Sequence, residues 1–431
     1  MRSIRLVAFW NLFLAAALAG NRLQADDWPQ WGGPQRDLVW RESGIVQSLP
    51  AGRLPRVWTA KVGEGYAGPA VADGKVYLTD RIHGEGNDGV ERVLCLDAES
   101  GDLLWKHEYE CLYSVSYPAG PRATPLCHDR LVYTLGAVGH LFCLDAETGE
   151  IVWSRFFPDD FGTRLPTWGT AAAPLVDGDQ LIALVGGPDA LVVSFDRRTG
   201  KELWRALDDP GVGYCPPMIY DFDGQRQLII WHPQAVSALD PRSGASLWDH
   251  RFPVQAGLTI ATPRKHNNRL LVSSFYNGSL MLEVSSGGAE EVWRGKSDSE
   301  IRTDGLHALM GTPILTDTHI YGVGSYGQLR CLDADTGRRV WETFEATGED
   351  RWWNAFLIPH EDRVFIHNEQ GELIIARLTP EGYDEDSRAL LIEPTRPVRR
   401  RMTIWSHPAF AMQSVFARND KVLVRVNLAA E

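Results

Sequence analysis

The chain has 431 residues, of which 44% are hydrophobic and 23% are charged. This composition is typical of a packed globular protein and excludes wholesale disorder. The formal net charge of −13, without a long basic run, argues against binding to nucleic acid, which requires clustered Lys and Arg. The 16 tryptophans and 41 glycines are unusual and indicate a repeat that uses one Trp and one turn Gly per copy.

The N-terminus has the pattern of a secretory signal peptide over residues 1–25. A basic MRSIR start precedes the apolar stretch LVAFWNLFLAAALA, and LQA offers small-residue cleavage before Asp26. A membrane anchor is the alternative, for which the stretch is short. Asn21 stands where a lipoprotein would need its lipid-bearing Cys. We expect a periplasmic or secreted protein without a lipid anchor or transmembrane segment, in which a lead-in segment, 26–53, precedes one domain, 54–431.

One template recurs along this domain, with an Asp eight residues and a Gly four residues before a Trp. An apolar strand leads into the Asp, which can hydrogen-bond the turn backbone, and Gly supplies positive φ. The Trp begins the next strand and can pack on a neighbouring sheet. We therefore assign these residues a structural role. They are Asp97, Gly101 and Trp105; Asp145, Gly149 and Trp153; Asp196, Gly200 and Trp204; Asp240, Gly244 and Trp248; Trp293 in a degenerate copy; and Asp333, Gly337 and Trp341.

A second pattern, a small residue and Pro followed by two short strands, begins each repeat of about 47 residues. Four antiparallel strands per repeat predict an all-β fold, a β-propeller of eight four-stranded blades. Seven blades are the alternative if a degenerate unit is not a blade. The last unit stops after its third strand, whereas 54–62 carries Trp58 with no blade before it. We expect this N-terminal strand to complete the last blade.

The Asp-Ala-x-Thr-Gly-x-x-x-Trp template resembles the tryptophan-docking repeat of pyrroloquinoline-quinone (PQQ)-like propellers. This superfamily includes quinoprotein alcohol dehydrogenases and the outer-membrane assembly protein BamB. The resemblance covers 54–431 and implies the fold, and DDWPQWGGPQRD (26–37) is similar to the lead-in of many secreted PQQ-like repeat proteins. Enzymes and binding scaffolds share this fold, so it does not decide the function.

The resemblance to the dehydrogenases implies an adjacent Cys-Cys pair, a Trp platform and Ca²⁺ held by carboxylate and amide oxygens. No two of the six cysteines are adjacent here, and HExxH, GxSxG and P-loop motifs are absent. We predict no catalytic residues, no metal site and no cofactor. PQQ with calcium is expected only under the alternative hypothesis, a quinoprotein dehydrogenase of alcohols or sugars.

The connections from the fourth strand of one blade to the first strand of the next are long and chemically varied. Such loops often carry function. Their aromatic, Arg, Asp and His residues could stack on a sugar or anchor a partner protein, or they could simply plug the channel. The predicted binding face comprises Tyr66, Arg122, Trp168, Tyr214, Arg302, Asp304, His307, Trp353 and Trp405.

These observations favour a monomeric, non-catalytic scaffold that binds an envelope protein at this face, as the resemblance to BamB implies. A carbohydrate-binding propeller is the other alternative. The basic run at 396–401, RPVRRR, is interpreted as a solvated loop rather than a docking patch.

Overall fold

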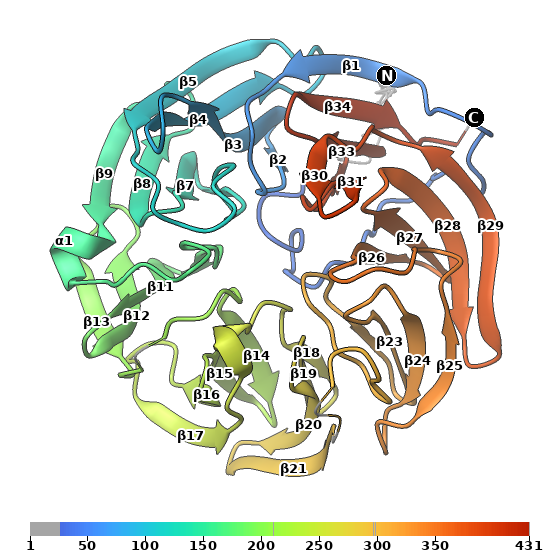
Figure 1. Cartoon of the computed structure of the whole chain (residues 1–431). Helices are drawn as coiled ribbons and strands as arrows, with labels where there is room; N and C mark the ends of the chain where they lie inside the picture. The colour runs from blue at the N-terminus through green and yellow to red at the C-terminus, as the bar shows by residue number, and fades with distance from the viewer. Residues whose placement is uncertain (1–25, 210, 296, 298, 431) are drawn as a thin grey trace, which may run out of the picture.

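The structure is a computed structural model that describes residues 26–430 except 210, 296 and 298. Over these residues, eight four-stranded antiparallel sheets are arranged in a ring around a central axis (Figure 1). The prediction of an all-β propeller with eight blades is therefore confirmed. The predicted signal peptide, 1–25, lies outside the described residues. Among the described residues, no helix is long and apolar enough to cross a membrane.

Each blade runs from strand A at the channel to strand D at the outer edge. The first four blades are β2 (Ala70–Ala72), β3 (Lys75–His83), β4 (Gly89–Asp97) and β5 (Leu103–Glu110); β6 (Leu126–His128), β7 (Leu131–Leu135), β8 (His140–Asp145) and β9 (Ile151–Phe156); β10 (Leu175–Asp177), β11 (Gln180–Gly187), β12 (Ala190–Asp196) and β13 (Glu202–Ala206); and β14 (Met218–Phe222), β15 (Gln225–Trp231), β16 (Ala235–Leu239) and β17 (Ser246–Arg251).

The remaining blades follow the same order. They are β18 (Arg264–His266), β19 (Arg269–Ser274), β20 (Gly278–Ser285) and β21 (Gly288–Arg294); β22 (Ile314–Leu315), β23 (His319–Val323), β24 (Leu329–Asp333) and β25 (Arg339–Thr343); β26 (Ala355–His360), β27 (Arg363–Asn368), β28 (Glu372–Thr379) and β29 (Gly382–Leu390); and β32 (Ala409–Ala411), β33 (Ser414–Arg418), β34 (Val422–Asn427) and β1 (Arg56–Lys61).

The ring closes through β1, which pairs antiparallel with β34 and places Thr59 opposite Val424. The N-terminal strand therefore completes the last blade, as the sequence predicts. In Figure 1, β1 lies beside β34 on the outer side of that blade. Closure gives the last blade four strands like the other seven, with β1 as its outermost strand.

The repeated Asp organises the turn between strands C and D. Asp145 Oδ1 accepts hydrogen bonds from the backbone N–H groups of Glu147 and Thr148, both at 2.9 Å. These bonds, that from Thr148 first, lower the pKa of the Asp145 carboxyl. Gly149 follows at φ 73°, a left-handed conformation that a Cβ would disfavour. The turn is thereby fixed by three residues of the template.

The repeated Trp docks on the turn of the next blade. Trp105 donates from Nε1 to the Ala146 carbonyl at 3.0 Å, and a Cβ at Gly149 would lie 2.5 Å from its ring. Only Gly therefore admits the indole at this approach. The same pairs of Trp and turn Gly are Trp58 with Gly101, Trp153 with Gly200, Trp204 with Gly244, and Trp293 with Gly337.

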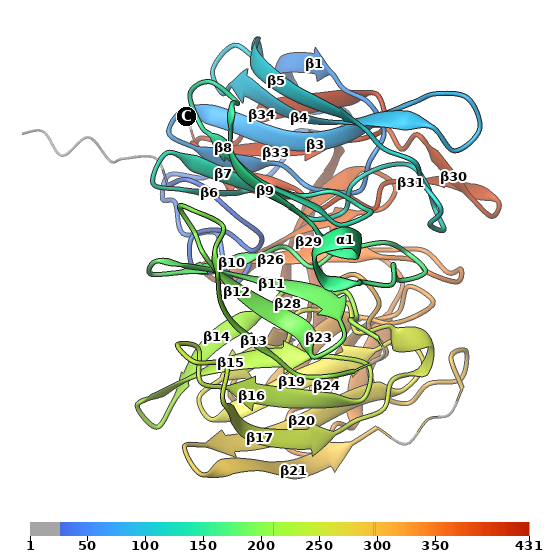
Figure 2. The ribbon, with the colours of Figure 1, turned by 90° about the vertical axis from the view of Figure 1, so that its left-hand side faces the viewer.

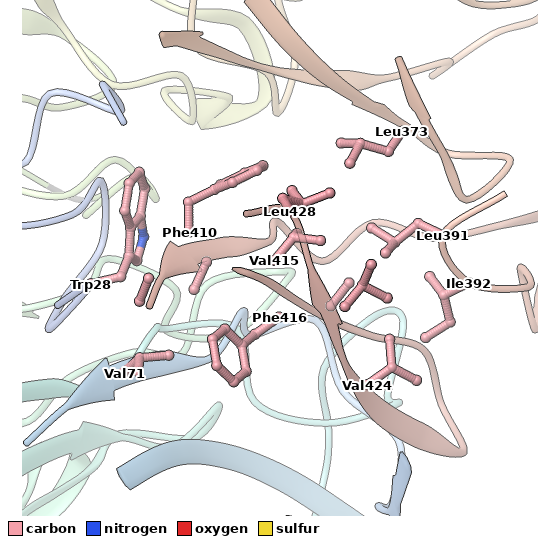
Figure 3. Packing of buried hydrophobic residues seen from close by; sticks show 14 of the residues in the cluster. Trp28, Val71, Leu373, Leu391, Ile392, Phe410, Val415, Phe416, Val424 and Leu428 are labelled. Carbon is pink, nitrogen blue, oxygen red and sulfur yellow. The ribbon is translucent and has the colours of Figure 1, made fainter. Parts of the chain in front are cut away.

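Residues 26–53 close one end of the channel. Arg36, 5% exposed, reaches between blades and donates to the carbonyls of Pro174 at 3.0 Å and Pro217 at 3.2 Å. Trp28 and Trp40 are buried in the same core cluster as Phe410 of the last blade, and Figure 3 shows Trp28 beside Phe410. The lead-in is thus part of the packed core rather than a loose tail.

The opposite face carries the connections from strand D to strand A. They include α1 (Phe157–Phe161), the 3₁₀ turn Gln255–Gly257, and a hairpin of β30 (Arg396–Val398) and β31 (Arg401–Thr403). Figure 2 shows this hairpin projecting on the side away from the lead-in. We call this side the D–A face; it is where the sequence predicts the binding residues.

Candidate functional site

A cavity of about 430 Å³ occupies the channel between the lead-in and the D–A face. Trp31 of the lead-in contributes to one end, where its Nε1 donates to Thr262 Oγ1 at 2.9 Å. Tyr117, 36% exposed, stands at the other end. The lining residues are Trp31, Tyr66, Ser116, Tyr117, Arg122, Thr124, Trp168, Ala171, Ala173, Tyr214, Pro216, Leu258, Ile260, Tyr276, Leu309, Met310, Trp352, Phe356, Trp405 and His407.

Aromatic rings from several blades meet in this wall. Trp168 and Tyr214 are edge to face with centroids 5.6 Å apart. Tyr117 lies 5.7 Å from Trp405 and 6.5 Å from Trp352. Such rings offer large, rigid, apolar contact surfaces that retain polar edges.

Two of these aromatic residues have unusual backbone conformations. Tyr117 has φ 55° and Trp352 has φ 69°, in the left-handed region that bulky side chains seldom adopt. Both residues lie in D–A connections and present their rings to the cavity. Local strain of this kind often accompanies functional loops, which points to the mouth of the cavity.

Arg122 is the guanidinium in the cavity wall. It donates to the carbonyls of Gly120 at 2.6 Å, Ser116 at 2.8 Å and Tyr117 at 2.6 Å. Its carbon Cζ lies 5.1 Å from the centroid of Tyr66. Burial lowers the pKa of Arg122, because the charged form is poorly solvated there.

His407 is the other basic group in the wall. It is 5% exposed, and burial lowers its pKa to about 4. Its Nε2 lies 2.7 Å from Thr124 Oγ1, and its ring is perpendicular to that of Trp31 at 4.4 Å between centroids. The imidazole is therefore neutral at physiological pH and part of the packed wall.

The structure brings five residues of the predicted binding face into one cavity wall. The same wall contains Ala171, Ile260 and Met310, each of which lies four residues before strand A of its blade. The five residues are Tyr66, Arg122, Trp168, Tyr214 and Trp405.

Four predicted residues lie elsewhere. Trp353 is 6% exposed and packs against Gly348. Its neighbour Trp352, with φ 69°, lines the cavity instead. His307 is a core residue, 1% exposed, with Nδ1 2.9 Å from the Phe275 carbonyl. Arg302 and Asp304 are exposed, outside the cavity lining. The cavity wall thus holds five of the nine residues of the predicted binding face, and their role in binding stays a prediction.

Sequence reasoning missed several wall residues. Tyr117 lies in a connection that the sequence already marks as long, whereas Trp31 lies in the lead-in. Neither belongs to a repeated position, so periodicity gives no signal for them. The residues missed include Trp31, Tyr117, Tyr276, Trp352, Phe356 and His407.

The basic run at 396–401 is mostly paired within the protein. Arg396 forms ion pairs with Asp420 and Glu64, and Arg401 with Glu369 and Asp350. Arg399 lies 3.4 Å from Asp350. These pairs tie the hairpin to its neighbours.

A second cluster lies between the first two blades, where ligand atoms of Glu91, Cys111 and His140 fall within 4.8 Å of one another. Glu91 is fully buried and accepts hydrogen bonds from the hydroxyls of Tyr109 and Tyr113 and from the Ala137 N–H at 3.0 Å. Burial raises the pKa of its carboxyl. The donors satisfy Glu91 as a structural acceptor.

The cavity does not fit PQQ with calcium. None of its lining residues is an Asp or Glu, whereas Ca²⁺ takes carboxylate and other oxygen ligands. Its one guanidinium contrasts with the three carboxylates of PQQ, and adjacent cysteines are missing from the sequence. The residues present therefore do not supply the cofactor site of the dehydrogenases.

The fold and cavity define a tryptophan-docking β-propeller whose channel is closed by its lead-in. The chain belongs to the family described as "Outer membrane protein assembly factor BamB", which matches residues 89–343 and 232–429. The resemblance to PQQ-like propellers is thereby confirmed.

Two curated relatives represent both functional classes. The outer membrane protein assembly factor BamB of Burkholderia pseudomallei is 28% identical over 315 residues, covering 69% of this chain and 61% of that protein. Quinohemoprotein alcohol dehydrogenase ADH-IIG of Pseudomonas putida is 25% identical over 357 residues, which cover 79% of this chain and 41% of that protein. The chain thus spans less than two thirds of either relative.

Solved structures share the fold at low identity. BamB from Moraxella catarrhalis has a TM-score of 0.58 and 16% identity, with 86% of this chain and 97% of that chain covered. Quinohemoprotein alcohol dehydrogenase from Comamonas testosteroni has a TM-score of 0.62 and 14% identity, covering 94% and 81%. These likenesses show the fold and do not decide the function.

Proposed function

We propose that the protein is an exported, non-catalytic scaffold that binds a polypeptide partner in the cell envelope through the D–A face. One observation carries this proposal: the open end of the channel holds an aromatic cavity with an arginine and without carboxylates in its lining. Buried aromatic residues and Arg are the side chains on which protein interfaces most often depend. The family description, an outer membrane protein assembly factor, supports an envelope partner.

The chemistry of the wall disfavours the two alternatives. A quinoprotein dehydrogenase would need calcium ligands and a carboxylate base beside the cofactor, and the lining contains neither Asp nor Glu. A sugar would use the aromatic faces but also needs several polar groups for its hydroxyls. Besides the tyrosines, the lining offers Ser116, Thr124, Arg122 and His407, and Thr124 and His407 are hydrogen-bonded to each other.

Partner capture from envelope extract of the native organism tests the proposal. The wild-type protein is compared with a Trp352→Ala/Trp405→Ala variant, which removes two indole rings from the cavity lining. The matched control is Leu104→Ala/Val152→Ala, since these side chains are 49% and 46% exposed on outer strands. We expect the cavity variant to lose proteins that the control retains, as judged by quantitative mass spectrometry.

A parallel assay separates binding from catalysis. PQQ and Ca²⁺ are added to the purified protein, and dye reduction is followed with alcohols and sugars. We expect no turnover. Equal capture by the cavity variant, or PQQ-dependent turnover, overturns the proposed function.

A further inference from the structure

We propose that the cavity recognises the carboxyl-terminal residue of its partner, with the terminal carboxylate at Arg122 and an apolar side chain against the opposite wall. This inference rests on the proposed function and specifies the part of the partner that enters the cavity.

The charge of the wall favours a carboxylate. Arg122 is held by three backbone carbonyls, which orient the guanidinium without neutralising it. No described carboxylate lies within ion-pair distance of this side chain, and none is among the lining residues. A poorly solvated, uncompensated cation gains most from an anion that can also accept directed hydrogen bonds.

Access distinguishes Arg122 from other arginines held in the same way. Arg36, Arg81 and Arg418 also donate to backbone carbonyls, but none of them lines the cavity. Capping carbonyls with arginine is therefore a general device in this fold. Of these four arginines, only Arg122 has its guanidinium in the wall of the cavity.

The wall across the channel is apolar. Arg122 precedes the second blade, whereas Ile260 and Met310 precede the fifth and sixth blades, on the other side of the ring (Figure 1). Leu258 and Leu309 add to this side. A ligand with a carboxylate at one end and an aliphatic or aromatic group at the other would match both sides.

The shape of the space favours a chain end over an internal segment. Trp31 closes the cavity at the lead-in, so a polypeptide that enters from the D–A face cannot pass through. A volume of about 430 Å³ suits one or two residues. An internal Asp or Glu would require the chain to enter and leave through the same opening, whereas a terminal residue enters once.

Binding of short peptides to the full-length protein, measured by isothermal titration calorimetry, tests the inference. The probe is acetyl-Gly-Gly-Gly-Phe with a free carboxyl terminus. Its matched control is the same peptide with a terminal amide, and acetyl-Gly-Phe-Asp-Gly-amide presents an internal carboxylate. We expect the amide and the internal acid to bind at least about tenfold more weakly than the free acid. Raising the salt concentration should weaken the free acid more than the amide.

An Arg122→Gln variant locates the carboxylate. We expect it to bind the free acid and the amide equally, while Arg122→Lys retains part of the preference. The comparison of the two peptides on the wild-type protein needs no variant, so a folding defect in either variant leaves the test intact.

The outcomes separate the two proposals. Equal affinity for acid and amide, or tighter binding of the internal acid, overturns the carboxyl-terminal inference while leaving the scaffold proposal standing. If no peptide binds but partner capture depends on the cavity, the carboxyl-terminal inference is again overturned and the scaffold proposal stands. Partner capture that does not depend on the cavity overturns the scaffold function and the inference that rests on it.

Discussion

The indole of Trp58 lies directly on Gly101, so that the first strand of the chain in the last blade is locked to the first blade. A Cβ at Gly101 would fall 2.7 Å from the ring, and the indole Nε1 donates to the Ala98 carbonyl at 2.9 Å. This contact repeats the docking found between successive blades, but here it joins the two ends of the ring. The docked indole thus adds to the pairing of β1 with β34, which closes the ring.

Replacing Gly101 by Ala should disrupt this closure. The substitution places a side chain at φ 77° and against the indole, and we expect a loss of about 3 kcal/mol in the free energy of unfolding. Gly74→Ala is the matched control, because Gly74 has φ 72° and a Cβ added there would meet no atom within 4 Å; it should cost about 1 kcal/mol. Urea denaturation of both variants measures the difference, and equal losses would contradict a role for the docked indole.

The repeat tryptophans should contribute more to stability than those of the cavity. Trp153 is 8% exposed and donates to the Arg197 carbonyl at 2.9 Å, so Trp153→Ala should cost about 3–5 kcal/mol. Trp168 is only partly buried, in the cavity wall, and Trp168→Ala should cost clearly less. Urea denaturation again provides the comparison; a Trp168→Ala loss as large as that of Trp153→Ala would show that the cavity wall is structural.

Trp353, which the sequence places on the predicted binding face, is 6% exposed and is not among the residues that line the cavity. Its indole packs on Gly348 and Arg401 lies over its ring at 5.9 Å. Trp353→Ala should therefore destabilise the protein about as much as Trp153→Ala does. Unfolding measurements on the two variants side by side would refute this assignment if Trp353→Ala proved nearly neutral.

The sequence predicts the ring because blade architecture uses the same residues at the same spacing. The turn Gly and the docking Trp recur at a regular spacing in the sequence. Trp58 has the Trp of this repeat without a blade before it, and this is enough to predict closure. The lead-in occurs only once, so it has no recurring pattern. Arg36 binds backbone carbonyls, which any residue provides, so its partners cannot be recognised from their residue type. Its role in the core could not be predicted from periodicity.

The sequence predicts those residues of the candidate site that occupy the same position in successive blades. The position before strand A places Tyr66, Arg122, Tyr214 and Trp405 in one wall because each blade repeats the same geometry. Before the seventh blade, Trp353 is buried, and its neighbour Trp352, with φ 69°, lines the cavity instead. Such a local conformation of a bulky residue has no sequence signal.

Buried histidines should make stability depend on pH. Burial lowers the pKa of both His367 and His407 from 6.5 to about 4. The unfolded chain therefore binds more protons than the folded chain between these values, so stability is fully present above pH 6.5 and declines as the pH falls toward 4. Each histidine contributes on the order of 3 kcal/mol to this decline.

A His367→Gln/His407→Gln variant should flatten that dependence. Its free energy of unfolding should change less between pH 7 and pH 4.5 than that of the wild-type protein, as measured by urea denaturation at each pH. His128→Gln serves as the control, because His128 is exposed and should leave the wild-type slope unchanged. A double variant with the wild-type slope would mean that carboxylates alone set the acid response.

The lead-in should stabilise the ring through Arg36. Its buried guanidinium bridges the third and fourth blades through the carbonyls of Pro174 and Pro217, and burial lowers its pKa to about 10. Arg36→Ala leaves these buried acceptors without a donor, and we expect a loss of about 3 kcal/mol in the free energy of unfolding. Arg41→Ala, in the same segment, removes an exposed ion pair with Asp37 and an exposed hydrogen bond to the Val39 carbonyl, and it should cost less than about 1 kcal/mol. If the two variants unfolded at the same urea concentration, the lead-in would be a surface segment rather than a closure of the channel.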